Sequence, residues 1–296
     1  MAEIYSYKVF AAVVENGNFT KAARVLKITP SAVSHTISKL EGEVGFPLFI
    51  RNRNTMELSQ NGKALLPEIY NLIRLQDRIT QEKQEILGVK KGTVRIGAFN
   101  SVTMKWLPGI MDSFKEKYPG INVEVMQGKY SEVSEGVKTG MLDLGFVTST
   151  SELHSEIIPL YEDPLVCVTP LDFIPENRDY ITVDEISRMT ILMQAEGLAQ
   201  DTETFLEKHD IRLDSKIRVA DDSSLVAMVA SGFGVSIMPK LLFDGNENNV
   251  NLYEISPAET RTIGLITVRE QFISPAAGRL RDEIIAFAKN YQQFPG

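Results

Sequence analysis

The 296-residue chain is poor in cysteine and in long apolar segments, and each shortage excludes a class of protein. Its single cysteine, Cys167, cannot form an internal disulfide, so we expect a reducing compartment and not a disulfide-stabilised secreted fold. Cys167 lies in an apolar run, which favours a small buried side chain over a redox switch. The least polar stretch, residues 227–239, contains two serines and two glycines and is too short to cross a bilayer. The first residues, MAEIYSYK, lack the pattern of a secretory signal, so a cytoplasmic protein without membrane contact is expected.

Basic residues are outnumbered by acidic ones in the whole chain, 31 Lys and Arg against 39 Asp and Glu, so the formal net charge is −8. Residues 1–91 nevertheless contain 13 Lys and Arg against 9 Asp and Glu, whereas the remaining 205 residues contain 18 against 30. Because only the N-terminal part has an excess of positive charge, we expect the protein to bind a polyanion through that part alone.

The segment FTKAARVLKITPSAVSHTISKLEGEVGFPLF, residues 19–49, has the pattern of two short helices joined by a tight turn. Thr20 is expected to cap the first helix, residues 27–29 to form the turn, and Pro30 to start the second helix. The buried face of that second helix is predicted to consist of Ala32, Val33, Ile37 and Leu40.

The other face of the second helix carries hydroxyls, an imidazole and an ammonium group, which suit base edges in a major groove. Two short alternating runs around the Asn-rich turn at 52–54 then predict a β-hairpin, the wing, with arginines suited to phosphates or the minor groove. An ordinary helical hairpin with a solvated basic turn is the alternative. The predicted DNA-binding residues are Thr29, Pro30, Ser31, Ser34, His35, Ser38, Lys39, Arg51 and Arg53.

A long helix is predicted over residues 60–88, capped by Ser59. Apolar residues recur along it every seven positions, which is typical of a coiled-coil seam between two copies of a chain. The seam residues are Leu65, Leu72, Ile79 and Ile86.

From residue 93 onward strands and helices alternate, which predicts an α/β fold with a parallel sheet. Strands are expected at 94–98, 121–126 and 144–147, separated by helices at 101–118 and 130–139, and two more strands at 157–161 and 165–169. A second α/β unit with helices at 201–209 and 223–231 follows, then a returning strand at 262–268 and a final helix at about 275–292. Two lobes joined by two crossing segments make a cleft at the carboxyl ends of the strands. The expected domains are a winged helix-turn-helix domain (1–59), a linker and dimerisation helix (60–92) and a two-lobed domain (93–296), with lobe I at 93–162 and 268–296 and lobe II at 163–267.

This order of parts resembles the LysR-type transcriptional regulators over the whole chain. The segment at 19–51, the stretch FKEKYPGINVEV and the sequence GVSIMP carry the resemblance. It implies a periplasmic-binding-protein-like effector domain, double-stranded DNA and a small-molecule effector as partners, and a homodimer or homotetramer formed through the 60–88 helix and the effector domains. RNA polymerase is a further partner that the family suggests. This chain has His35 and Thr36 where family members often carry arginine and glutamine, so the family's base preference does not transfer directly.

Polar side chains follow the predicted strands and begin the predicted helices, where a ligand of the cleft would lie. Helix capping is the alternative role for each of them. No arginine or lysine lies at these positions, which favours a small carboxylate or inorganic anion as effector. The predicted effector-binding residues are Asn100, Ser101, Thr103, Gln127, Gly128, Thr148, Ser149, Thr202, Asp222 and Ser223.

Other function classes remain open at this point. The two-lobed part resembles solute receptors and prephenate-dehydratase-like enzymes, and a structural nucleoid protein is a third alternative. The sequence shows no metal-ligand spacing, no Gly-x-Ser-x-Gly and no phosphate loop, while His154 and His209 stand alone in polar stretches. We therefore expect no enzyme activity, no metal and no cofactor.

Overall fold

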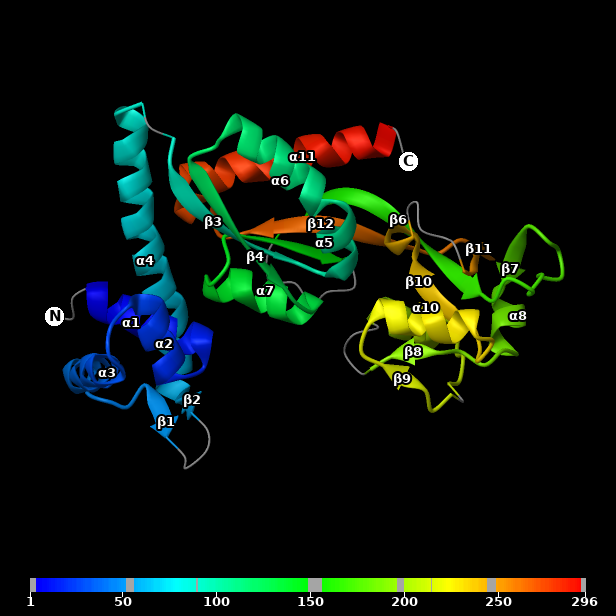
Figure 1. The fold of residues 1–296 in the computed structure, drawn as a ribbon, viewed down its shortest axis with the longest axis horizontal. Helices are drawn as coiled ribbons and strands as arrows, with labels where there is room; N and C mark the ends of the chain where they lie inside the picture. Colours follow the sequence, from blue (N-terminus) through cyan, green and yellow to red (C-terminus); the bar gives the residue numbers. More distant parts are fainter. Residues whose placement is uncertain are drawn as a thin grey trace.

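The computed structural model describes residues 4–51, 56–88, 90–148, 156–195, 200–213, 215–243 and 249–293. It has three parts in a row: a small helical domain, one long helix and an α/β domain of two lobes (Figure 1). In the described residues no helix is both long and apolar enough to cross a membrane.

The N-terminal domain consists of three helices around one apolar core and a short hairpin. Asn18 caps the second helix by accepting the N–H groups of Thr20 and Lys21, so the expected cap at Thr20 is wrong by two residues. Pro30 begins the third helix, as predicted, and Thr29, which was expected only in the turn, caps it. The carboxylate of Glu41 accepts the backbone N–H of Leu48 at 2.8 Å and so ties the third helix to the hairpin. The elements are α1 (Ile4–Asn16), α2 (Phe19–Leu26), α3 (Pro30–Val44), β1 (Phe49–Arg51) and β2 (Met56–Leu58).

The long helix α4 (Gln60–Ile86) begins at Ser59, whose hydroxyl accepts the N–H of Gly62 at 2.9 Å. One side of α4 is buried against the N-terminal core through Leu66, Ile69, Tyr70 and Ile73. Three of the four predicted seam residues face away from that core, since the exposed fractions of Leu72, Ile79 and Ile86 are 40%, 61% and 86%. The fourth, Leu65, packs against the N-terminal core.

The first lobe is built on a sheet whose strands β3, β4 and β5 are parallel, as predicted. Helices α6 and α11 cover one face of this sheet and α7 covers the other (Figure 1). The expected single helix at 101–118 is interrupted at Trp106, because Pro108 lacks an N–H and disfavours helical backbone just before it. The elements are β3 (Gly92–Ala98), α5 (Asn100–Lys105), α6 (Leu107–Lys117), β4 (Ile121–Gln127), α7 (Tyr130–Thr139), β5 (Leu144–Thr148), η2 (Glu270–Phe272) and α11 (Pro275–Gln293).

The second lobe has its own core around Cys167, Ile181 and Phe205. The predicted helices at 201–209 and 223–231 are present, and β7, α8 and β11 are elements that the sequence pattern did not predict. Its elements are β7 (Tyr180–Thr182), α8 (Val183–Ser187), β8 (Met193–Gln194), α9 (Gln200–Lys208), β9 (Arg218–Val219), α10 (Asp222–Ala230), β10 (Ser236–Pro239), η1 (Lys240–Leu242) and β11 (Asn251–Ser256).

Two strands, β6 (Ile158–Thr169) and β12 (Thr260–Thr267), connect the lobes. β6 is one strand of 12 residues, so the expectation of two separate strands is wrong. Its first part pairs with β12 and its second part with β10 and β11, so the ladder continues across the polar residues in its middle. β12 also pairs with β5 and places Ile263, Leu265 and Ile266 in the core of the first lobe, although the sequence had assigned them to the second.

Polar contacts attach α4 to the first lobe. The guanidinium of Arg74 is buried, donates to the carbonyl of Leu142 and lies 3.4 Å from the carboxylate of Asp143. The side chain of Gln81 accepts the N–H of Ala276, the second residue of α11, at 3.2 Å. The N-terminal domain, α4 and the first lobe are therefore held together by contacts along the length of the helix.

Candidate nucleic-acid interface and ligand cavity

Helix α3 lies at the end of the molecule away from the second lobe, beside the hairpin (Figure 1). Val33, Ile37 and Leu40 are buried under α3, as predicted from their spacing. The opposite side presents hydroxyl, imidazole and ammonium groups without apolar cover. Its exposed residues from the predicted set are Thr29, Pro30, Ser31, His35, Ser38 and Lys39, while Ser34 is half-buried.

Two details of this surface differ from the prediction, and a third lies outside what the structure describes. Ala32 is exposed, so its expected place on the buried face is wrong and its methyl group joins the outer surface of α3. Thr29 does more than was predicted, because its hydroxyl both caps α3 and lies 2.9 Å from the hydroxyl of Ser31. Arg51 is the last residue of β1, but its side chain, like all of Arg53, lies outside the described part of the chain.

A cavity of about 550 Å³ lies between the lobes. It is bordered by the first turns of α5 and α7 in the first lobe and by the first turns of α9 and α10 in the second. Its lining residues are Phe99, Asn100, Ser101, Gln127, Gly128, Lys129, Tyr130, Glu132, Gln194, Gln200, Asp201, Thr202, Ala220, Asp221, Asp222, Leu225, Ile237, Met238, Pro239, Leu242 and Arg261.

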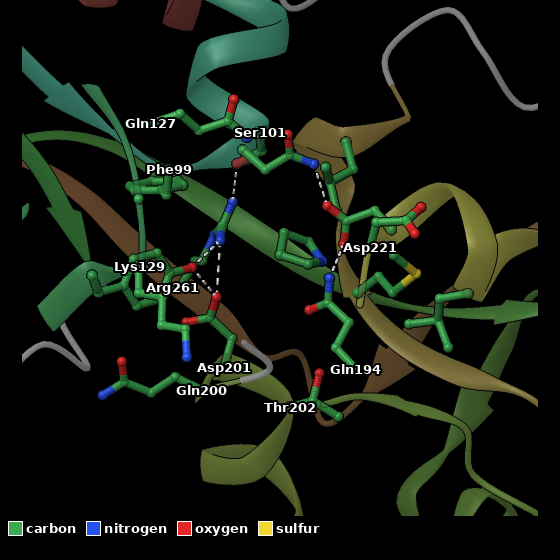
Figure 2. Close-up of a pocket in the computed structure, with 18 of the residues that line it drawn as sticks. Phe99, Ser101, Gln127, Lys129, Gln194, Gln200, Asp201, Thr202, Asp221 and Arg261 are labelled. Carbon is green, nitrogen blue, oxygen red and sulfur yellow. Dashed lines mark hydrogen bonds and ion pairs between the residues drawn. The ribbon is translucent and has the colours of Figure 1, made fainter. Parts of the chain in front are cut away.

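Arg261, on β12, joins the two lobes at the base of this cavity. Figure 2 shows its guanidinium pointing toward Ser101 on one side and Asp201 on the other. Nη2 donates to Ser101 Oγ at 2.7 Å and Nη1 donates to Asp201 Oδ2 at 2.8 Å. The remaining contacts are Nη1 to Tyr130 Oη at 2.6 Å, and Nη2 and Nε to Asp163 Oδ2 at 2.7 and 2.9 Å.

The charge of Arg261 is stable although the side chain is only 3% exposed. Burial acts to lower its pKa, but the surrounding acidic oxygen atoms, those of Tyr130, Asp201 and Asp163, raise the pKa above its ordinary value. The guanidinium therefore acts as a permanent cation at the junction of the lobes.

A second contact between the lobes runs through Asp222, the first residue of α10. Its carboxylate accepts the side-chain N–H of Asn100 from the first lobe and that of Gln194, at 2.8 Å, from the second. Gln127 in turn donates to the side-chain oxygen of Asn100 at 3.0 Å. Burial raises the pKa of the Asp222 carboxyl, and the hydrogen bond from Asn100 and the positive charge of Arg261 offset only part of this rise.

Six of the predicted effector-binding residues line the cavity, and three others of the set do not. Thr103 instead donates to the carbonyl of Phe99 at 3.0 Å, Thr148 is completely buried in β5, and Ser223 lies outside the lining of the cavity. Ser149 lies outside the described residues. The six in the lining are Asn100, Ser101, Gln127, Gly128, Thr202 and Asp222.

Of the charged residues of the site, sequence reasoning identified Asp222 alone. Lys129 and Arg261 border the cavity as well, although no lysine or arginine was among the predicted positions. Asp201 and Asp221 each stand next to a predicted residue at a helix start and could have been found by extending the same rule. Arg261 could not, because β12 is antiparallel to its neighbours and the rule concerns the ends of parallel strands.

Two family models match this chain. The model of the bacterial regulatory helix-turn-helix proteins of the lysR family matches residues 4–63, and the model of the LysR substrate binding domain matches residues 88–289. The uncharacterized HTH-type transcriptional regulator YvbU of Bacillus subtilis (strain 168) is 28% identical over 265 residues, which are 88% of this chain and 90% of that protein.

Solved structures share the whole architecture. A full-length OxyR variant from Pseudomonas aeruginosa superimposes with a TM-score of 0.73 at 17% identity, covering 98% of both chains. Full-length CbnR complexed with its target DNA gives a TM-score of 0.63 at 18% identity, covering 97% of this chain and 99% of that one. At these identities the likeness shows a common fold.

Proposed function

Because the chain belongs to the LysR family of bacterial transcription regulators, we propose that it binds its operator through α3 and the wing and is switched by a small molecule in the cavity between its lobes. The observation that carries this proposal is that one cavity takes its lining from both lobes. A ligand there contacts both moving parts at once, which is what coupling of binding to lobe position requires.

In this proposal the side chains of α3 enter the major groove. Ser31, Ser34 and His35 contact base edges, while Lys39 and the wing arginines contact phosphates. The exposed methyl of Ala32 adds an apolar contact of the kind that distinguishes thymine from cytosine. Residues 1–59 are the DNA-binding domain, 60–92 the linker and dimerisation region, and 93–296 the effector domain.

The cavity supports a two-state mechanism. The contact between Asn100 and Asp222 holds the lobes together, and so does the Tyr130 hydroxyl, which donates to Asp201 at 2.5 Å. A ligand that replaces or reinforces these contacts changes the relative free energies of the open and closed lobes. A coupling of about 1–3 kcal/mol is enough to change operator occupancy several-fold.

We further propose that the protein acts in the cytoplasm as a homodimer or homotetramer and catalyses no reaction. The exposed apolar residues of α4 support dimerisation, and the relatives that the chain matches are transcription regulators. An N-terminal DNA-binding domain has no role in an enzyme of the dehydratase type or in a solute receptor.

Footprinting on an operator selected by the wild-type protein from random duplex DNA tests the proposal. The double variant Ser34→Ala/His35→Ala should lose roughly 1–3 kcal/mol at one base position and relax specificity there. Arg53→Ala should weaken all sites together and reduce the salt dependence, because a phosphate contact carries no base information.

Ser187→Ala in the second lobe serves as the control and should give the wild-type footprint. Equal footprints from the wild type and the double variant would refute the assignment of α3. Uniform protection of bulk DNA would instead indicate a structural nucleoid protein.

A further inference from the structure

Acidic side chains outnumber basic ones around the cavity between the lobes. Its carboxylates come from Glu132, Asp201, Asp221 and Asp222, and its cations from Lys129 and Arg261. An anion entering this space therefore meets an excess of negative charge, in contrast to the small anion that the sequence alone suggested.

The cation of Arg261 is already used inside the protein. A guanidinium has five N–H donors, and the five hydrogen bonds of Arg261 go to oxygen atoms of Ser101, Tyr130, Asp163 and Asp201. A carboxylate ligand would have to displace one of these buried partners. Helix α5, where the sequence placed an anion, has six residues, and its Ser101 hydroxyl accepts a hydrogen bond from Arg261.

Asp222 differs from Arg261, because the groups that hydrogen-bond its carboxylate are neutral and Arg261 acts on it without forming an ion pair. Its two amide partners, Asn100 and Gln194, carry no charge, and in the described part of the chain no cationic side chain contacts its carboxylate. A carboxylate has about four acceptor positions, so two remain for a ligand. A partly buried carboxylate is stabilised when a cation contacts it, and a charge-assisted hydrogen bond is stronger than a neutral one.

Apolar side chains form the wall beside Asp222. They belong to the second lobe, apart from Phe99, and the cavity of about 550 Å³ leaves room for a small organic molecule beside the polar groups. The apolar lining residues are Phe99, Ala220, Leu225, Ile237, Met238, Pro239 and Leu242.

We propose that the effector is a small organic amine, whose ammonium group binds Asp222 and whose apolar body packs against the Leu225–Met238 side of the cavity. This inference rests on the proposed function, in which a ligand of this cavity switches the regulator. Because Asn100 reaches Asp222 from the first lobe, an ammonium group at Asp222 also changes the contact that links the lobes.

Three probes of the same shape and different charge test the ligand class on the full-length protein: phenethylamine, 3-phenylpropionate and 2-phenylethanol. Isothermal titration calorimetry should show phenethylamine binding on the order of tenfold tighter than either of the others, the effect of one hydrogen-bonded charge pair. The isosteric variant Asp222→Asn should abolish this preference. Asp172→Asn, an exposed carboxylate of the second lobe outside the cavity lining, should retain it.

Equal or tighter binding of 3-phenylpropionate would overturn the amine assignment and leave the cavity as an effector site. Phenethylamine binding that survives Asp222→Asn, or that is lost equally in Asp172→Asn, would also overturn it. No binding of phenethylamine at concentrations of several millimolar would overturn it as well. The operator footprint of the wild-type protein tests the proposed function independently of any probe, so the two failures are distinguishable.

Discussion

Arg261 places a permanent charge where both lobes meet, and its loss is predicted to be costly. The substitution Arg261→Met leaves Asp163, which is completely buried, and Asp201 without their cation. We expect the free energy of unfolding to fall by about 3–5 kcal/mol, the usual cost of breaking a buried ion pair from one side. Urea denaturation followed by circular dichroism measures the change.

The matched control is Arg281→Met, which removes an arginine that pairs with Glu270 and Asp282 at the surface of α11. We expect that change to cost less than about 1 kcal/mol. The double variant Arg261→Met/Asp163→Asn should recover part of the loss, because it removes a buried charge. An Arg261→Met protein as stable as wild type would contradict the role of the network.

Cys167 allows a second prediction at this scale. The side chain is completely buried, and burial raises the pKa of its thiol, so the reactive thiolate is not formed in the folded protein. Iodoacetamide in slightly alkaline buffer should leave the native protein unmodified and alkylate it fully in denaturant, as read by intact-mass spectrometry. Cys167→Ser supplies the zero-thiol baseline. Rapid alkylation of native protein would contradict the burial.

Individual residues of the two sites were predictable where their place at the start of a helix determines their role. Pro30 and Thr29 start α3 through local rules of helix geometry, and Asn100 and Asp222 start helices that point into the cleft. Arg261 was not predictable, because its partners are 60 to 160 residues away in the chain. No local pattern marks a side chain whose environment is assembled entirely from distant segments.

At the scale of elements, α4 carries a prediction about assembly. Replacing Leu72 by aspartate puts a charge into the proposed seam, while the buried side of α4 stays intact. We expect Leu72→Asp to abolish the dimer and operator binding, since two half-sites can no longer be held together. Sedimentation velocity and gel-shift assays measure the two effects.

Thr80→Asp is the matched control, because Thr80 is exposed on α4 outside the seven-residue repeat. It should remain a dimer with wild-type affinity. If Leu72→Asp also stays dimeric and binds DNA, the apolar repeat does not form the dimer interface.

Most elements followed from the sequence, and β6 shows why some did not. Residues 162–164, Glu-Asp-Pro, interrupt the apolar alternation and predict a break. In the fold the strand continues through them, because β12 pairs with its first part, Asp163 bonds to Arg261, and β10 and β11 pair with its second part. Local propensity is overruled here by partners that come from more than 65 residues later in the chain.

At the scale of the whole molecule, the attachment of α4 to the first lobe through Arg74 is open to test. Arg74→Met leaves the carboxylate of Asp143 without its buried cation. Amide hydrogen exchange in the middle of α4 should then become at least about tenfold faster. In the variant, local opening of the helix costs less free energy, because it does not have to break this buried contact. Mass spectrometry of peptides from α4 and from the second lobe measures both regions.

The second lobe should exchange at its wild-type rate, since Arg74 does not contact it. Lys138→Met, which removes an exposed cation from α7, should leave α4 unchanged. Wild-type exchange in α4 of the Arg74→Met protein would show that the buried contact does not hold the helix.

Because α4 is anchored to both the N-terminal domain and the first lobe, the chain consists of two structural units. The N-terminal domain, α4 and the first lobe form one unit. The second lobe is joined to this unit by β6, β12 and the contacts around the cavity. When a ligand moves the second lobe, the distance from α3 to the first lobe within the same chain stays the same. If the proposed function holds, we therefore expect the effect of the ligand to pass from the second lobe of one chain to a neighbouring copy. Two copies bound to one stretch of DNA would then change their mutual angle, and the bend of the DNA between them would change with it.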